Sequence, residues 1–268
     1  MKHYAVFGQP IAHSLSPRIH AAFAAQCGIE LEYRAIESGR EGFAHVLDEF
    51  ARAGGAGANV TLPLKEDAFA LCAARSERAM RCGSVNTLIR DDGQWRGDST
   101  DGSGLLRDLR ERHDLEPHDR RVLMLGAGGA ARAAAFALVD AGVRELLIAN
   151  RSNERASALA QALGPCAAAC AFDRSAERSA FDLVINATAA GHGGGAFTVP
   201  APQVQAHTFA YDLSYGKAAQ PFLDWARSAG IARSSDGLGM LVEQAADAFE
   251  LWHGLRPGTA SVYAMLRT

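Results

Sequence analysis

The chain has 268 residues, a length that accommodates two domains of ordinary size. Hydrophobic residues make up 48% and charged residues 21%, and these values are near the averages for globular proteins, which excludes a disordered or fibrous chain. The formal net charge of −3 implies no cationic surface, so we expect neither nucleic acid nor a membrane as a partner.

The N-terminal segment meets Gly8, Pro10 and His13 before an apolar region long enough for a signal peptide can develop, and no later apolar run reaches the length of a membrane span. We therefore expect a cytoplasmic protein. Its five cysteines include no C-x-x-C pair and no evident cluster with histidine, so we expect reduced thiols and no metal site.

The first block, up to about residue 100, alternates short apolar runs with amphipathic stretches, as is typical of α/β proteins. Apolar residues at helical spacing predict a helix from Pro17 that ends at Gly28. Asp92-Gly93 suits the tight turn of a hairpin between residues 86–90 and 94–97. The other expected elements are strands at His3–Phe7, Leu31–Glu37 and around Ala58–Val60, and a helix over about 42–53.

The second block follows a helix near Gly102–Arg112 and a polar stretch, residues 113–121, that we interpret as a linker or surface loop. Its alternation of apolar strands and helices over more than a hundred residues predicts a parallel sheet with helices on both faces. The helices expected at 239–254 and 260–267 either cap this block or return to the first. The strands are expected at 122–125, 145–150, 181–188 and 208–213, with a helix at 154–163.

Gly126-Ala127-Gly128-Gly129-Ala130-Ala131 matches the pattern G-x-G-x-x-A, directly after an apolar strand and at the start of a helix. The first glycine permits a tight turn, the second lets backbone N–H groups approach a pyrophosphate, and the small third residue lets helix and strand pack closely. This context favours a dinucleotide site over the alternative of a merely structural turn.

The next strand ends in Asn150-Arg151-Ser152, where NAD-binding folds usually place an acidic residue against the ribose 2′-hydroxyl. No acid is present there, and a guanidinium group suits a 2′-phosphate because it can bind phosphate oxygens in bidentate fashion. We therefore expect NADP. In the alternative interpretation Arg151 is a solvated charge and Ser152 caps the following helix.

Polar side chains gather at three places in the first block that a plain scaffold would not require. Singly, each is better explained as a helix cap, a turn residue or a surface charge. Together they predict a pocket for a small polyhydroxylated acid at the strand ends of an α/β sheet. The residues are Ser14 and Ser16 before a helix, Asn59, Thr61 and Lys65 after a strand, Asn86 at the hairpin, and Asp101.

At this point the sequence resembles the shikimate dehydrogenase family over nearly its whole length. The motifs that carry the resemblance are Gly8-Gln9-Pro10-Ile11, His13-Ser14, Ser16-Pro17, Asn59-Val60-Thr61-Leu62-Pro63 with Lys65, Val85-Asn86-Thr87, Thr100-Asp101-Gly102, the Gly126 turn, Asn150-Arg151, Asn186-Ala187-Thr188, Tyr211-Asp212, and Asp236-Gly237-Leu238-Gly239-Met240-Leu241 with Gln244.

The resemblance implies an NADP-dependent, reversible reduction of 3-dehydroshikimate to shikimate, in the pathway to chorismate and the aromatic amino acids. It also implies an α/β fold with a substrate domain over residues 1–101 and a Rossmann domain, a doubly wound parallel sheet, over residues 102–237, around a deep cleft. Helices in residues 238–268 would pack back on the substrate domain. We expect a small-molecule substrate and a monomer or homodimer.

The family's functional residues carry over by position. Lys65 and Asp101 are the implied catalytic pair. The resemblance assigns the substrate carboxylate to Ser14 and Ser16, and the substrate ring to Asn59, Thr61, Lys65, Asn86, Asp101, Gln244 and Tyr215. It assigns the cofactor to Gly126, Ala127, Gly128, Gly129, Ala130, Asn150, Arg151, Ser152, Arg155, Leu213 and Gly237, with Glu77 a weaker candidate.

The chain departs from the usual family pattern at Ala21, Ser99, Ala189-Ala190 and Gln220, which leaves the catalytic pair intact. Physically, Lys65 as ammonium can stabilise a developing alkoxide and donate a proton to it, and Asp101 can orient the ammonium. Either residue can be the immediate acid on this argument. Two rival functions are a quinate/shikimate dehydrogenase that uses NAD and a non-catalytic dinucleotide-binding sensor, which would have no use for the pair.

Overall fold

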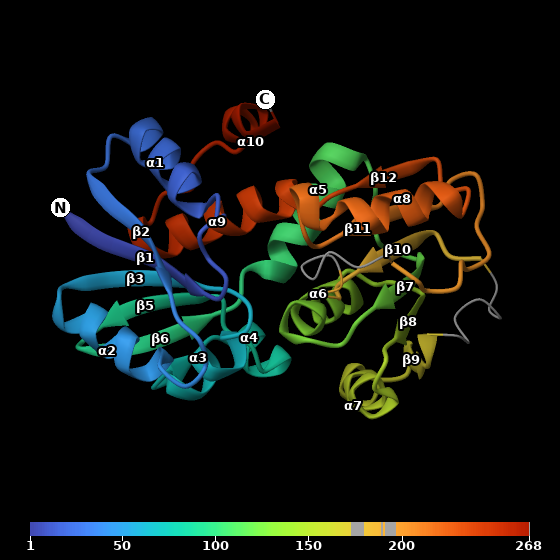
Figure 1. Ribbon diagram of the computed structural model, residues 1–268, viewed down its shortest axis with the longest axis horizontal. Helices are drawn as coiled ribbons and strands as arrows, with labels where there is room; N and C mark the ends of the chain where they lie inside the picture. Colours follow the sequence, from blue (N-terminus) through green and yellow to red (C-terminus); the bar gives the residue numbers. More distant parts are fainter. Residues whose placement is uncertain (173–179, 189, 191–196, 268) are drawn as a thin grey trace. The chain divides into compact units, whose positions relative to one another are not determined.

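Figure 1 shows the computed structural model, which describes residues 1–172, 180–188, 190 and 197–267. The chain divides into two compact units. Unit 1 comprises Met1–Gly104 and Leu241–Thr268, and unit 2 comprises Leu105–Met240. Helices α5 (Asp101–His113) and α9 (Leu238–His253) contribute residues to both units. Within the described ranges, no helix has the length and apolar character needed to cross a membrane.

Unit 1 is built on a mixed six-stranded sheet in the order β2-β1-β3-β5-β6-β4. The three strands β2, β1 and β3 run parallel, β5 is antiparallel to both β3 and β6, and β4 pairs with β6 in parallel. The strands are β1 (Lys2–Gly8), β2 (Leu31–Glu37), β3 (Gly55–Val60), β4 (Ala74–Arg75), β5 (Thr87–Asp91) and β6 (Gln94–Asp98).

Alternating side chains of β1 serve two cores, one on each face of this sheet. Ala5 and Phe7 pack in a cluster with residues of α2, α3 and α4, whereas Tyr4 packs with Trp252 of α9 on the opposite face. Apolar residues of α1, α9 and α10 form a third cluster. The helices not yet given bounds are α1 (Ser16–Cys27), α2 (Phe43–Arg52), α3 (Lys65–Leu71), α4 (Glu77–Cys82) and α10 (Ala260–Arg267).

The turn and helix-end residues act as the sequence predicts. Gly28 ends α1 in the left-handed conformation with φ 64°, and the hairpin between β5 and β6 turns at Asp92 and Gly93 with φ 44° and 76°. Three short elements, α3, β4 and α4, were not expected because their apolar patterns span too few residues to reveal a period. The final helices return to the first block, because unit 1 includes the chain from Leu241 onward.

Unit 2 is a six-stranded parallel sheet in the order β12-β11-β10-β7-β8-β9, which confirms the predicted doubly wound arrangement. Leu123 and Leu125 of β7 pack with Phe222 of α8, while Val122 and Met124, which point to the other face, are equally buried. Both faces of the sheet are therefore covered. The strands are β7 (Arg121–Leu125), β8 (Glu145–Ala149), β9 (Ala167–Cys170), β10 (Leu183–Asn186), β11 (Phe209–Asp212) and β12 (Arg233–Ser235).

The chain leaves β7 toward β8 and β9 on one side and later returns to β10, β11 and β12 on the other, so the strand order reverses between β7 and β10. In open parallel sheets ligands bind at the carboxyl edge near such a reversal. Of the 113–121 stretch, residues 114–120 form a loop inside unit 2, between α5 and β7, and not a linker between the units. The helices are α6 (Gly129–Asp140), α7 (Asn153–Leu163), α8 (Gln220–Ser228) and the short η3 (Gly216–Ala218).

Each sheet gathers the predicted site residues at one edge. In unit 1, the carboxyl ends of β1, β3 and β6 lie at the same edge as the start of the antiparallel strand β5. In unit 2, the Gly126 turn and the residues after β8, β10, β11 and β12 all follow carboxyl ends of parallel strands. Topology thus brings together residues that are far apart in sequence.

Candidate active site

A buried ion pair lies at the strand-end edge of unit 1. Lys65 is the first residue of α3, and its Nζ donates to Oδ2 of Asp101, the first residue of α5, at 2.6 Å. The two side chains are only 13% and 6% exposed. Such a pair is poorly screened by solvent, so its charges act strongly on any group bound beside it.

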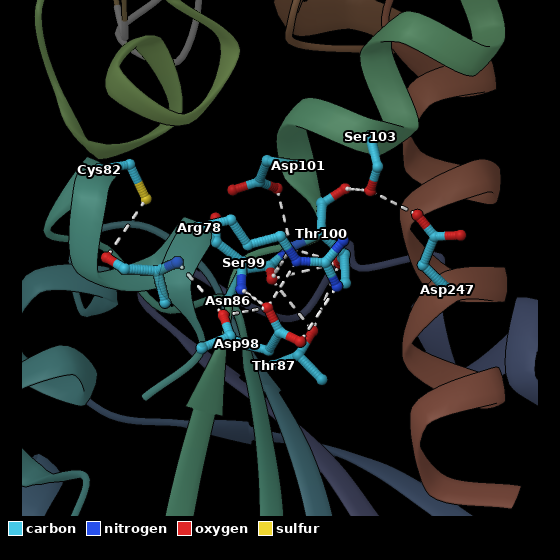
Figure 2. Close-up of polar contacts among 12 residues, drawn as sticks. Arg78, Cys82, Asn86, Thr87, Asp98, Ser99, Thr100, Asp101, Ser103 and Asp247 are labelled. Carbon is cyan, nitrogen blue, oxygen red and sulfur yellow. Dashed lines mark hydrogen bonds and ion pairs between the residues drawn. The ribbon is translucent and has the colours of Figure 1, made fainter. Parts of the chain in front are cut away.

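The side-chain amide of Asn86 connects Asp101 of this pair to Thr100 (Figure 2). Its Nδ2 donates to Oδ1 of Asp101 at 3.0 Å and to Oγ1 of Thr100 at 2.9 Å, and its Oδ1 accepts from the Thr100 backbone N–H at 2.8 Å. Because a backbone N–H can only donate, the amide has a single possible orientation. Asp101 is therefore held through both carboxylate oxygens, one by Asn86 and one by Lys65.

Helix α9 brings Gln244 to the same cluster from the other end of the chain. Oε1 of Gln244 lies 3.1 Å from Nδ2 of Asn86 and shares one of that nitrogen's two N–H groups with the acceptors named above. The backbone carbonyl of Gln244 accepts from Oγ1 of Thr100 at 3.1 Å. Its Nε2 donates to the carbonyl of Leu241 at 2.8 Å. The tertiary fold thus completes a polar cluster in which Asn86 and Gln244 are 158 residues apart in sequence.

Asn59, near the end of β3, forms the opposite side of this polar cluster. Its Nδ2 donates to the carbonyl of Asn86 and to Oγ1 of Thr87, both at 3.2 Å, and its Oδ1 accepts from the hydroxyl of Tyr33 at 2.7 Å. Thr61 lies just beyond β3, with its backbone N–H bonded to the carbonyl of Phe7 at 2.8 Å.

Ser14 and Ser16 lie at the start of α1, in the turn that follows β1. The backbone N–H of Ser16 donates to Oγ of Ser14 at 3.3 Å, so the two residues are adjacent in space. Leu15, not Ser16, occupies the N-cap position, and the cap has no side-chain hydrogen bond. The interpretation of Ser16 as a helix cap is therefore wrong.

Asp98 anchors the turn that leads from β6 to Thr100 and Asp101. Oδ1 of Asp98 accepts from the backbone N–H of Ser99 at 2.7 Å, from Oγ of Ser76 at 2.5 Å and from Nε of Arg78 at 2.6 Å (Figure 2). Burial raises the pKa of this carboxyl, but the hydrogen bonds from Arg78 and Ser76 outweigh it and hold the pKa below its usual range. Asp98 therefore stays ionised and fixes the turn.

Some residues of this cluster carry no sequence signal of function. Thr87 and Thr100 belong to family motifs without a predicted role, and the sequence predicts no role for Asp98 or Tyr33. Tyr33 lies within an ordinary strand, so only its contact with Asn59 reveals its place. Asp98 ends β6, whose sequence QWRGD already contains Gln94 and Arg96, so a charged residue at its end gives no distinct signal.

The Gly126 turn of unit 2 has room for a ligand at its backbone. Gly128 is the N-cap of α6 and is exposed, and a Cβ added there would meet no atom within 4 Å. Gly126 instead adopts φ 111°, and a Cβ there would lie 2.9 Å from the backbone of Ala187. The first N–H groups of a helix have no intrahelical partner, and the open space at Gly128 gives a phosphate access to this helix N-terminus. Ala127, Gly129 and Ala130 complete this turn.

The residues after β8 lie at the same edge as the Gly126 turn. Arg151, Ser152 and Arg155 are exposed at the start of α7, and Nδ2 of Asn150 donates to the carbonyl of Ser152 at 2.9 Å. Ser152 occupies the N-cap position of α7 without a side-chain cap hydrogen bond. Both arginines are thus exposed, and no acid occupies the strand end itself; Glu154 lies between them in the first turn of α7.

Asp212, at the end of β11, organises the segment that contains Leu213 and Tyr215. Its Oδ1 accepts from the backbone N–H of Ser214 at 2.7 Å and its Oδ2 accepts from Nδ2 of Asn186 at 2.8 Å. Burial raises the pKa of Asp212 to about 7 in spite of these bonds. Gly237 packs directly on this segment, since a Cβ there would lie 2.5 Å from the carbonyl oxygen of Leu213.

Sequence comparison identifies relatives along almost the entire chain. The family descriptions that match are "Shikimate dehydrogenase substrate binding domain" over residues 6–88, "Shikimate / quinate 5-dehydrogenase" over residues 109–193, and "Shikimate 5'-dehydrogenase C-terminal domain" over residues 237–267. The shikimate dehydrogenase (NADP(+)) of Xanthomonas campestris is 57% identical, covering 98% of this chain and 95% of the relative. This chain belongs to the shikimate dehydrogenase family.

Solved structures agree with this assignment to the shikimate dehydrogenase family. The shikimate 5-dehydrogenase of Thermus thermophilus, in complex with NADP(H) and shikimate, is 37% identical with a TM-score of 0.87, covering 100% of this chain and 99% of that one. An Ael1 enzyme from Pseudomonas putida is 43% identical with a TM-score of 0.89, covering 99% and 98%. The recognition of the family from its motifs is therefore confirmed.

Within this family member, each unit brings together most of its share of the predicted site residues. Asn59, Lys65, Asn86, Asp101 and Gln244 join one hydrogen-bonded cluster through shared partners. Tyr215 belongs to unit 2. Glu77 belongs to unit 1, where it is the first residue of α4. It lines a hollow together with Ser76, Arg78 and Arg81. Ala189, one of the departures from the family pattern, lies outside the described residues, whereas Ala190 is exposed.

Proposed function

We propose that this chain catalyses the reversible, NADP-dependent reduction of 3-dehydroshikimate to shikimate. The observation that carries the proposal is the Lys65–Asp101 pair, 2.6 Å between Nζ and Oδ2, set in a cluster of amide and hydroxyl groups. A site that only stored a dinucleotide would have no need for a buried ammonium beside neutral donors and acceptors. The activity places the protein in the pathway to chorismate and the aromatic amino acids.

The residues of unit 2 fit the cofactor NADP. The helix N-terminus that follows the Gly126 turn suits its pyrophosphate, and the open space at Gly128 leaves room for it. Arg151 and Arg155 stand exposed where an acid would repel a 2′-phosphate. We assign Asn150 and Ser152 to the same subsite and Leu213 and Gly237 to the segment beside it. When bound, the cofactor exchanges a hydride with the carbon that carries the reacting oxygen.

The substrate is assigned to unit 1. Ser14 and Ser16 are adjacent hydroxyl-bearing residues suited to a carboxylate, while Asn59, Thr61, Asn86 and Gln244 surround the pair with groups suited to ring hydroxyls. We also assign a contact to Tyr215 and a weaker cofactor contact to Glu77. The division into a substrate domain over 1–101 with 238–268 and a cofactor domain over 102–237 belongs to this proposal.

We assign proton transfer to the buried pair of Lys65 and Asp101. In the oxidation of shikimate, the reacting C–H bond breaks as its electrons leave with the hydride, and the hydroxyl must release its proton as the C=O bond forms. A deprotonated Lys65 accepts that proton, or Asp101 accepts it through Lys65. In the reverse direction the Lys65 ammonium stabilises the developing oxyanion and returns the proton. Asn86 keeps Asp101 in place throughout.

A steady-state assay tests this function and its rivals. Formation of NADPH is followed by absorbance with shikimate and NADP, and kcat/KM is measured for shikimate and quinate with both NADP and NAD. We expect the highest value for shikimate with NADP. A preference for quinate or NAD would favour the quinate/shikimate dehydrogenase, and binding of NADP without turnover of either acid would leave the non-catalytic sensor. A cytoplasmic location and a monomeric or homodimeric state remain predictions.

A further inference from the structure

Tyr33 stands at the start of a one-directional chain of hydrogen bonds that ends at the catalytic pair. Its hydroxyl donates to Oδ1 of Asn59 at 2.7 Å, and Nδ2 of Asn59 donates to Oγ1 of Thr87 at 3.2 Å. Oγ1 of Thr87 donates to Oδ1 of Asn86 at 3.0 Å, and Nδ2 of Asn86 donates to Oδ1 of Asp101 at 3.0 Å. Every donor in this chain points the same way, toward the carboxylate that accepts from Lys65.

The orientation of the Asn59 amide is fixed by its partners. The carbonyl of Asn86 can only accept, so the nitrogen of Asn59 must face it, and the oxygen must face Tyr33. Both N–H groups of Asn59 are then used, one by that carbonyl and one by Thr87. Oδ1 of Asn59 accepts from Tyr33, and the ring of His20 also interacts with the Asn59 side chain. As an acceptor, this oxygen favours a ligand hydroxyl and repels a carbonyl or carboxylate oxygen.

The ring of Tyr33 is held so that its hydroxyl reaches Asn59. It stacks on the ring of His20 with centroids 4.3 Å apart and planes 9° from parallel, and Trp252 lies 6.3 Å away. Burial lowers the pKa of His20 to about 3, so this neighbour is neutral at physiological pH. Burial also keeps the pKa of Tyr33 well above its usual value, with an interaction with the Ser16 side chain partly offsetting the rise. Tyr33 therefore remains a proton-bearing donor.

We propose that Tyr33 is a positioning residue for substrate binding, which holds Asn59 as a hydrogen-bond acceptor for a ring hydroxyl of the substrate. This inference rests on the proposed function, because it takes Asn59 as a substrate contact. It assigns a role in specificity to a side chain that belongs to none of the family motifs in the sequence. This role also explains why the Tyr33 hydroxyl is retained among the aromatic rings on this face of the sheet.

The test is Tyr33→Phe, which removes the hydroxyl and keeps the ring stacked on His20. We expect KM for shikimate to rise roughly three- to tenfold, the size of one lost hydrogen bond, with kcat within about twofold of wild type and KM for NADP unchanged. The matched control is Tyr4→Phe, which removes a hydroxyl from another buried ring of the same aromatic group, 4.6 Å from Trp252, and should leave KM unchanged.

A double-mutant cycle separates positioning from a merely structural role. In an Asn59→Ala background, Tyr33→Phe should leave the shikimate KM unchanged, because Tyr33 acts through Asn59. Equal effects of Tyr33→Phe with and without Asn59 would overturn the proposal. So would a Tyr33→Phe enzyme whose Tm falls while its KM stays at the wild-type value. A wild-type chain that does not turn over shikimate would overturn the proposed function itself, and this inference with it.

Discussion

Replacement of Lys65 by arginine separates its charge from its proton. Arginine keeps a positive charge beside Asp101 but has a pKa so high that it does not release its proton in proteins. Lysine is also rare in this chain, occurring only at positions 2, 65 and 217 among 27 basic residues, so its presence at this position is informative. If Lys65 transfers a proton, Lys65→Arg should lower kcat by roughly 10²–10⁴.

The structure predicts different stabilities for Lys65→Arg and Lys65→Ala. The guanidinium can still pair with Asp101, whereas alanine leaves without its cation a carboxylate whose side chain is only 6% exposed. Breaking a buried ion pair in this way typically costs about 3–5 kcal/mol, and the bond from Asn86 keeps the expected loss near the lower limit. Both variants should lose kcat, but only Lys65→Ala should lose substantial stability.

Three measurements decide the role of Lys65. Steady-state kinetics gives kcat and KM, titration gives the affinity for shikimate independently of turnover, and thermal unfolding gives the stability of each variant. Lys2→Arg, the same substitution at an exposed position of β1, is the control and should behave as wild type. A Lys65→Arg enzyme that binds shikimate normally and keeps nearly full kcat would refute proton transfer and leave Lys65 only a charge-stabilising role.

Three further predictions concern unit 2. Arg151→Ala should weaken NADP roughly tenfold to a hundredfold in a binding titration and leave NAD nearly unaffected, whereas equal losses would mean that Arg151 is structural. Gly237→Ala, which places a Cβ 2.5 Å from the Leu213 carbonyl oxygen, should cost about 1–3 kcal/mol in thermal unfolding, while Gly42→Ala should not, since its Cβ meets only Ser38 at 4.0 Å. Folding raises the pKa of Asp212 from 3.8 to about 7, so between these pH values the folded protein binds more protons than the unfolded protein. The free energy of unfolding of the wild type, measured relative to Asp212→Asn, should therefore fall as the pH rises from about 4 to 7 and stay constant above pH 7. The fall is at most about 4 kcal/mol, and a difference that does not vary with pH would contradict the raised pKa.

Sequence periodicity predicted most of the longer elements of both units because their physical causes are local, but it did not predict α8 (Gln220–Ser228). The glycine-rich turn after β7 and the hairpin turn at Asp92-Gly93 depend on backbone angles that few residues adopt, and their positions agree with the structure. Helix α2 agrees because Phe43, Leu47 and Phe50 recur on one buried face. Short elements such as α4 and β12 escaped prediction because six or three residues do not define a period.

The sequence by itself determined the family, the doubly wound fold and the kinds of residue available for chemistry, since motifs and local propensities are written in consecutive residues. Only the tertiary structure decided which partners those residues have. Tyr33 reads as an ordinary strand residue until the sheet brings it to Asn59, and Gln244 meets Asn86 only because α9 packs against unit 1. Hydrogen bonds between distant segments depend on directions and distances of a few ångströms, and the order of residues along a chain does not specify these without the fold.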